Sequence, residues 1–217
     1  MAYRVRLALC NLALWTIVAT AQAQAEPITI VALGDSLTAG YGLAEAQGLV
    51  PQLQAWLTAR GNDVVMVNAG VSGDTSAGGL SRLGWSLTPD ADALIVALGA
   101  NDMLRGIDPA VTRANLDAIL VEADAAGLPV LLVGVRSLGN YGADFRAAFD
   151  SMYPDLAAKH QTLLFPDFFA SLRSENATAN LSSYIQLDGL HPNAKGVALV
   201  VEALGPQVAA LAGRVGK

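Results

Sequence analysis

The chain of 217 residues has one cysteine, Cys10, and only two histidines, His160 and His191. A single cysteine excludes a disulfide framework and a thiolate metal cluster, and two histidines leave little basis for a histidine-rich metal site. We therefore expect no metal and no cofactor. Charged residues are also scarce, at 15%, and 13 basic against 19 acidic side chains give a formal net charge of −6. An acidic chain lacks the basic face that nucleic-acid phosphates require and is not attracted to anionic lipid headgroups.

Hydrophobic residues are abundant, at 53% of the chain. So much apolar surface excludes an intrinsically disordered protein, because such a chain collapses in water. The length is typical of one domain and is sufficient to bury a core. No internal repeat, low-complexity tract or long linker divides the chain, and we expect a monomer.

The segment 1–25 differs from the rest of the chain. Two arginines near its start precede an apolar run over residues 7–20, which is shorter than the ~20 apolar residues that a membrane span needs. Small-x-small sites follow the run, and this order predicts a signal peptide cleaved after Ala23 or Ala25. We therefore expect residues 26–217 to form a single domain, periplasmic or secreted, without a stable membrane anchor.

Short apolar runs alternate with longer amphipathic segments along the remaining chain. The runs cover residues 28–33, 64–67, 93–98, 130–133 and 162–165. Near-continuous apolar runs of this length are typical of parallel strands that are buried on both faces. Helices are expected at residues 48–60, 109–126, 143–160 and 192–211. This alternation predicts an α/β three-layer sandwich, with a flavodoxin-like, doubly wound, five-stranded parallel sheet and helices on both faces.

Candidate catalytic residues lie just after the predicted strands, where the ligand crevice of a doubly wound sheet is found. Ser36 follows the first strand, and Asp188 and His191 precede the last helix. A serine hydroxyl becomes a nucleophile when an imidazole takes its proton, and the imidazole needs a carboxylate to fix its tautomer. Taken alone, Ser36 reads as a helix N-cap. Together, the three residues indicate a catalytic triad of Ser36, His191 and Asp188.

Acyl transfer also requires hydrogen-bond donors at the position where negative charge develops on the carbonyl oxygen. The candidates at the same edge of the sheet are the backbone N–H groups of Ser36 and Gly70 and the side-chain amide of Asn101. Taken alone, Gly70 and Asn101 read equally as ordinary turn residues. The triad and these donors make up the predicted site, which contains no metal ligand.

Four segments of the chain resemble, in the same order, the sequence blocks of the SGNH (GDSL) hydrolase family. They are GDSLTAGYG at 34–42, NAGVSGDTSAGG at 68–79, LGANDMLRG at 98–106 and DGLHPNAKG at 188–196. The resemblance implies Ser36 as nucleophile, Asp188 and His191 as its triad partners, and Gly70 and Asn101 in the oxyanion hole. Within the family, the chain is most similar to the small periplasmic thioesterase, lysophospholipase and arylesterase group. It departs from that group at residues 136–142, where the usual proline is absent, so the acyl preference stays open.

This resemblance implies a serine esterase that hydrolyses arylesters, acyl thioesters and lysophospholipids through an acyl-enzyme on Ser36. Its expected partner is therefore a small acyl ester or thioester substrate. One alternative is a carbohydrate acetylesterase that uses the same residues. The other is a non-catalytic, flavodoxin-like binding domain, although the turn after the first strand lacks a P-loop lysine and a glycine-x-glycine dinucleotide turn.

Overall fold

The computed structural model describes residues 26–173 and 182–216, so the predicted signal peptide lies outside the described residues. One parallel sheet forms the middle layer, with strand order β2-β1-β3-β4-β5. This is the flavodoxin-like order, and the predicted fold class is confirmed. The strands are β1 (Ile28–Gly34), β2 (Val64–Gly70), β3 (Ala93–Ala97), β4 (Val130–Val133) and β5 (Leu163–Phe165).

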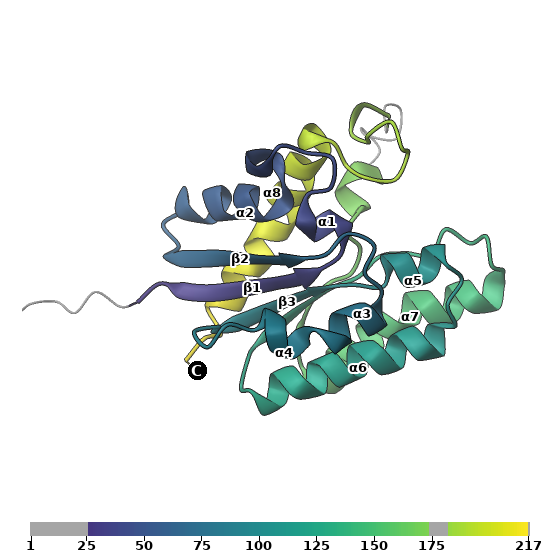
Figure 1. Cartoon of the computed structure of the whole chain (residues 1–217), viewed down its shortest axis with the longest axis horizontal. Coiled ribbons are helices and arrows are strands. Elements are labelled where there is room, and N and C mark those ends of the chain that lie inside the picture. The colour runs from purple at the N-terminus through teal and green to yellow at the C-terminus, as the bar shows by residue number, and fades with distance from the viewer. Residues whose placement is uncertain (1–25, 174–181, 217) are drawn as a thin grey trace, which may run out of the picture.

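Helices cover both faces of the sheet (Figure 1). On one face lie α2 (Leu49–Thr58) and α8 (Ala194–Ala212), and on the other lie α3 (Ser76–Ser81), α4 (Leu83–Ser86), α6 (Pro109–Ala125) and α7 (Ala143–His160). The short helices α1 (Ser36–Ala39) and α5 (Ala100–Leu104) begin directly after β1 and β3. Two 3-10 turns, η1 (Glu45–Gln47) and η2 (Ala170–Arg173), complete the described elements.

The burial of each strand depends on its place in the sheet. The central strands β1, β3 and β4 are buried on both faces almost throughout. The edge strands β2 and β5 are only partly buried, because each has a neighbour on one side alone. Helix α8 is long and apolar enough to cross a membrane by length and composition, but its buried side chains pack it against α2 and the sheet as a core helix.

The start of one predicted helix needs correction. The last helix begins at Ala194 and not at Pro192, because the Asn193 side chain caps it by accepting the N–H groups of Lys195 and Gly196. Pro192 instead forms an isolated bridge with Ile185. The sequence pattern also does not predict α1, α4 and α5, since four or five residues are too few to show a helical period.

Candidate active site

The turn after β1 places Ser36 at the carboxyl edge of the sheet. Asp35 is the N-cap of α1, and its Oδ1 accepts the Leu37 N–H at 3.0 Å. Gly34 precedes it without a side chain, because a Cβ there would overlap the side chain of Thr38. Ser36 therefore takes the first position of α1, where its own N–H has no helical partner.

The imidazole of His191 joins Ser36 to Asp188. His191 Nε2 lies 2.8 Å from Ser36 Oγ, and Nδ1 lies 2.7 Å from Asp188 Oδ2. The other carboxylate oxygen of Asp188 accepts the backbone N–H groups of Leu190 and His191 at 2.9 and 3.0 Å. These backbone bonds, followed by the bond from the imidazole, lower the pKa of Asp188 to about 2. The structure thus brings together the three residues predicted as a triad, with an ionised carboxylate against the imidazole.

Two residues that sequence reasoning missed hold the His191 loop in place. The Tyr41 ring lies against the imidazole, with 4.7 Å between the ring centroids. Gln186 donates its backbone N–H to the His191 carbonyl at 2.7 Å and its side-chain amide to the Tyr41 carbonyl at 2.8 Å. Tyr41 belongs to the sequence block at 34–42, so its position could have indicated a role at the site. Gln186 lies outside all four blocks, and nothing in the sequence indicates it.

Asn101 lies after β3, near the start of α5, and lines the same cavity as Ser36. Its Nδ2 donates to the Asp74 carbonyl at 2.9 Å and, over a longer 3.3 Å, to Asp35 Oδ2. Asp35 is 1% exposed. Burial, partly offset by the Leu37 N–H and the charge of His191, raises the pKa of Asp35 to about 6.

The backbone N–H of Gly70, which the sequence predicts as an oxyanion donor, already has a hydrogen-bond partner within the chain. Gly70 is the last residue of β2, and its N–H donates to Asn68 Oδ1 at 2.9 Å. A Cβ at Gly70 would overlap the backbone of Ala39, so this glycine lets α1 pack against β2. Gly73 lies farther along the loop and lines the same cavity as Ser36 and Asn101. Within residues 26–173 and 182–216, no hydrogen bond involves the Gly73 N–H.

A buried network fixes the loop of Gly73 relative to Asn101. Asp102 accepts both the N–H and the hydroxyl of Ser76, at 2.7 and 2.5 Å, and the hydroxyl of Thr112 at 3.1 Å. These three side chains are buried. Because Ser76 begins α3 directly after the loop and Asp102 follows Asn101, the network sets the spacing of the two candidate oxyanion donors.

An apolar cavity of about 450 Å³ opens beside the triad. Its wall comes from the segments that follow all five strands, and it includes Ser36 and His191. The apolar lining residues include Leu37, Met103, Val135, Phe169, Leu172 and Ile185. Such a cavity accepts an acyl chain whose carbonyl carbon lies at Ser36.

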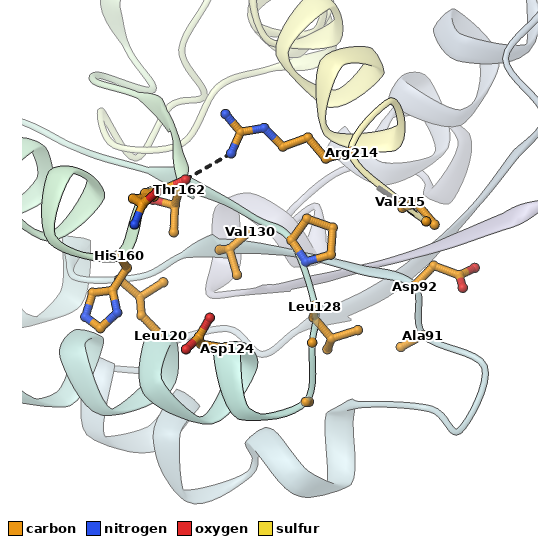
Figure 2. Close-up of a pocket in the computed structure, with 15 residues that line it drawn as sticks. Ala91, Asp92, Leu120, Asp124, Leu128, Val130, His160, Thr162, Arg214 and Val215 are labelled. Carbon is orange, nitrogen blue, oxygen red and sulfur yellow. Dashed lines mark hydrogen bonds between the residues drawn. The ribbon is translucent and has the colours of Figure 1, made fainter.

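A larger cavity, of about 710 Å³, lies at the opposite edge of the sheet (Figure 2). It is lined by residues around the amino end of β4 and by the segment from Arg214 to Gly216, and no predicted catalytic residue lines it. Arg214 there donates to the Gln161 carbonyl at 3.0 Å. His160 lines this cavity and bonds to Asp117 at 2.6 Å. No group of three or more histidine, cysteine or acidic side chains within the described ranges is arranged to hold a metal ion.

A serine, an imidazole and a carboxylate bonded in series beside an apolar cavity define the class of serine hydrolases. The chain belongs to the GDSL-like lipase/acylhydrolase family, whose model matches residues 32–199. It is therefore a carboxylic ester hydrolase, and the alternative of a non-catalytic binding domain is wrong.

Relatives and solved structures agree with this assignment. The chain is 41% identical to the esterase TesA of Pseudomonas aeruginosa over 170 residues, which cover 78% of this chain and 82% of the relative. It is 34% identical to the thioesterase 1/protease 1/lysophospholipase L1 of Escherichia coli over 183 residues, 83% of each chain. The structure of AlinE4, an SGNH-hydrolase family esterase, matches with a TM-score of 0.71 and 39% identity, covering 87% of this chain and 98% of that one.

Proposed function

We propose that Ser36, His191 and Asp188 form the catalytic triad of an esterase and thioesterase that works through an acyl-enzyme on Ser36. The observation that carries the proposal is the 2.8 Å contact between His191 Nε2 and Ser36 Oγ at the wall of an apolar cavity. The 2.7 Å bond to Asp188 fixes Nδ1 as the protonated nitrogen, so Nε2 is free to accept the serine proton.

The cycle follows from these contacts. His191 takes the hydroxyl proton as Ser36 Oγ attacks the carbonyl carbon of an ester or thioester. The imidazolium, held by Asp188, then protonates the leaving alcohol or thiol as its bond to the carbonyl carbon breaks. In the second half, His191 takes a proton from water, whose oxygen attacks the acyl-enzyme, and returns that proton to Ser36 Oγ as the acid leaves.

The oxyanion in this cycle is proposed to accept hydrogen bonds from the N–H groups of Ser36 and Gly73 and from Asn101 Nδ2. The three groups belong to residues that line the cavity. The bond from Asn101 to Asp35 is the longer of its two, at 3.3 Å, and its proton is the one that an oxyanion would attract.

The proposed substrates are arylesters, acyl thioesters and lysophospholipids. Relatives named as an arylesterase and as a thioesterase and lysophospholipase support this range. The cavity, with its apolar lining, favours an acyl chain longer than acetate. A chain-length series of nitrophenyl esters tests this preference, and a preference for acetate would favour the carbohydrate acetylesterase instead.

The proposed place of action is the periplasm or the medium, after signal cleavage following Ala23 or Ala25. The two arginines, the apolar run and the small-x-small sites of residues 1–25 support it. N-terminal sequencing of the exported protein tests the cleavage site. A retained segment 1–25 would contradict the proposal.

The nucleophile is tested by Ser36→Ala on a panel of esters and thioesters. Turnover should fall on the order of 10⁴-fold or more, as expected when a triad nucleophile is removed, with an unchanged circular dichroism spectrum. Ser72→Ala is the matched control, because Ser72 lines the same cavity and is exposed. Activity that survives Ser36→Ala, or an equal loss in Ser72→Ala, would contradict the assignment.

A further inference from the structure

Exposed apolar side chains are concentrated around the cavity that contains Ser36. Eleven large apolar side chains are exposed among the described residues, and seven of them follow the carboxyl ends of strands. Four of the seven line the cavity itself, namely Tyr41, Leu104, Leu138 and Leu190. The other three flank these positions and are Val71, Tyr141 and Leu187. We refer to these seven side chains as the apolar rim.

The apolar rim is more than the usual scatter of single exposed hydrophobic residues. Leu187 is completely exposed, at 110% of its reference area, and Leu138 is 61% exposed. Leu187 and Leu190 stand on either side of Asp188, and Val71 directly follows β2. A cluster of exposed apolar side chains is typical of a contact surface.

Positive charge accompanies the apolar rim although the whole chain is acidic, with a net charge of −6. Arg136 and Arg173 line the same cavity, and both contact the carboxylate of Asp167. The contact from Arg136 is long, at 3.8 Å, and this side chain is 68% exposed. The guanidinium group of Arg136 is therefore accessible to a ligand at the cavity.

We propose that the apolar rim docks the enzyme reversibly on a phospholipid–water surface. Apolar side chains of the rim enter the boundary between headgroups and acyl chains, and the exposed guanidinium group of Arg136 pairs with headgroup phosphates. The acidic remainder of the surface is repelled by an anionic lipid layer, which orients the rim toward it. An acyl chain then passes from the layer into the cavity at Ser36, a step that rests on the proposed function.

Docking is tested in a Ser36→Ala background, so that binding is measured without hydrolysis. Leu187→Gln and Val71→Gln change rim side chains that do not line the cavity, and Val121→Gln on α6 and Trp85→Gln on α4 are controls at exposed positions outside the rim. The probe is cosedimentation with vesicles of phosphatidylcholine containing phosphatidylglycerol. The affinity for vesicles should fall roughly tenfold for Leu187→Gln, because a leucine side chain is withdrawn from an apolar phase. The affinity should not change in the controls.

Hydrolysis by the same variants with Ser36 restored distinguishes docking from a wider substrate subsite. Nitrophenyl butyrate, a soluble monomer, should be hydrolysed within about twofold of the wild-type rate, whereas turnover of lysophosphatidylcholine micelles should fall roughly tenfold. An equal loss on both substrates would overturn the proposal, and so would the absence of vesicle binding by the Ser36→Ala parent protein. The proposal would also fail if the parent protein self-associated through the rim and the rim variants abolished that association. Vesicle binding without any ester hydrolysis would support docking while rejecting the proposed function.

Discussion

Replacement of Asp35 by asparagine is expected to change how the stability of the protein depends on pH. The carboxyl directly precedes Ser36 in the chain, is 1% exposed, and has its pKa raised from 3.8 to about 6. Between these two values the folded chain retains a proton that the unfolded chain has released. Folding is therefore favoured at low pH, and this contribution is fully present below about pH 4 and lost as the pH rises through about 6.

The size of the effect follows from the shift. Raising the pKa from 3.8 to about 6, at about 1.36 kcal/mol per pH unit, amounts to about 3 kcal/mol. Asparagine does not titrate, so the free energy of unfolding of Asp35→Asn relative to the wild type should rise by about 3 kcal/mol between about pH 4 and pH 8. Losing the 3.3 Å contact with Asn101 adds an offset that does not depend on pH and leaves this difference unchanged.

Urea denaturation of both proteins across that pH range measures the difference directly. The asparagine side chain of the variant can still accept the Leu37 N–H and cap α1, so we expect the variant to keep the wild-type fold. Asp124→Asn, at an exposed position of α6, serves as the control for a simple change of surface charge. A pH-independent difference between Asp35→Asn and the wild type would refute the assigned burial of a titrating carboxyl beside Ser36.

Two further substitutions test the oxyanion hole and its supporting glycine. Asn101→Ala should lower kcat by about 10²–10³-fold with little change in KM, the usual cost of one oxyanion donor, and steady-state kinetics showing a loss below fivefold would reject the role. Gly70→Ala should destabilise the fold by about 1–3 kcal/mol, since its Cβ would overlap the Ala39 backbone. Thermal unfolding measures this loss against Gly84→Ala, where a Cβ meets open space, and equal stabilities of the two variants would contradict the packing role.

The sequence predicts the sheet well because its central strands are buried on both faces. The run at 130–133 coincides with β4, and the strand order follows from the usual rules for parallel crossovers. The prediction is weaker at the edge, where β2 continues three residues beyond the apolar run, through Asn68 and Ala69 to Gly70. Polar residues are tolerated there because an edge strand is only half covered.

The three residues of the proposed triad could be selected from the sequence because chemistry limits the residue types that activate a serine. The chain has two histidines, and only His191 has a nearby aspartate in a loop after a strand. What the spacing does not predict is how the loop is held. The Gln186 bonds and the Tyr41 ring fix the imidazole, and these contacts join segments separated by 145 residues.

The choice between Gly70 and Gly73 as the proposed backbone donor shows why a donor is harder to predict from sequence than a nucleophile. Both glycines lie in the sequence block at 68–79, and neither has a side chain that would keep a substrate away from its backbone N–H. The difference depends on where β2 ends, because Gly70 pairs with Gly34 inside the sheet while Gly73 lies beyond it with a φ of 86°. A backbone N–H has the same chemistry in every residue except proline, so only the local fold decides which one faces the substrate. Side-chain chemistry therefore indicates the proposed nucleophile and its base, whereas the proposed oxyanion hole depends on a strand boundary that the apolar pattern places three residues too early.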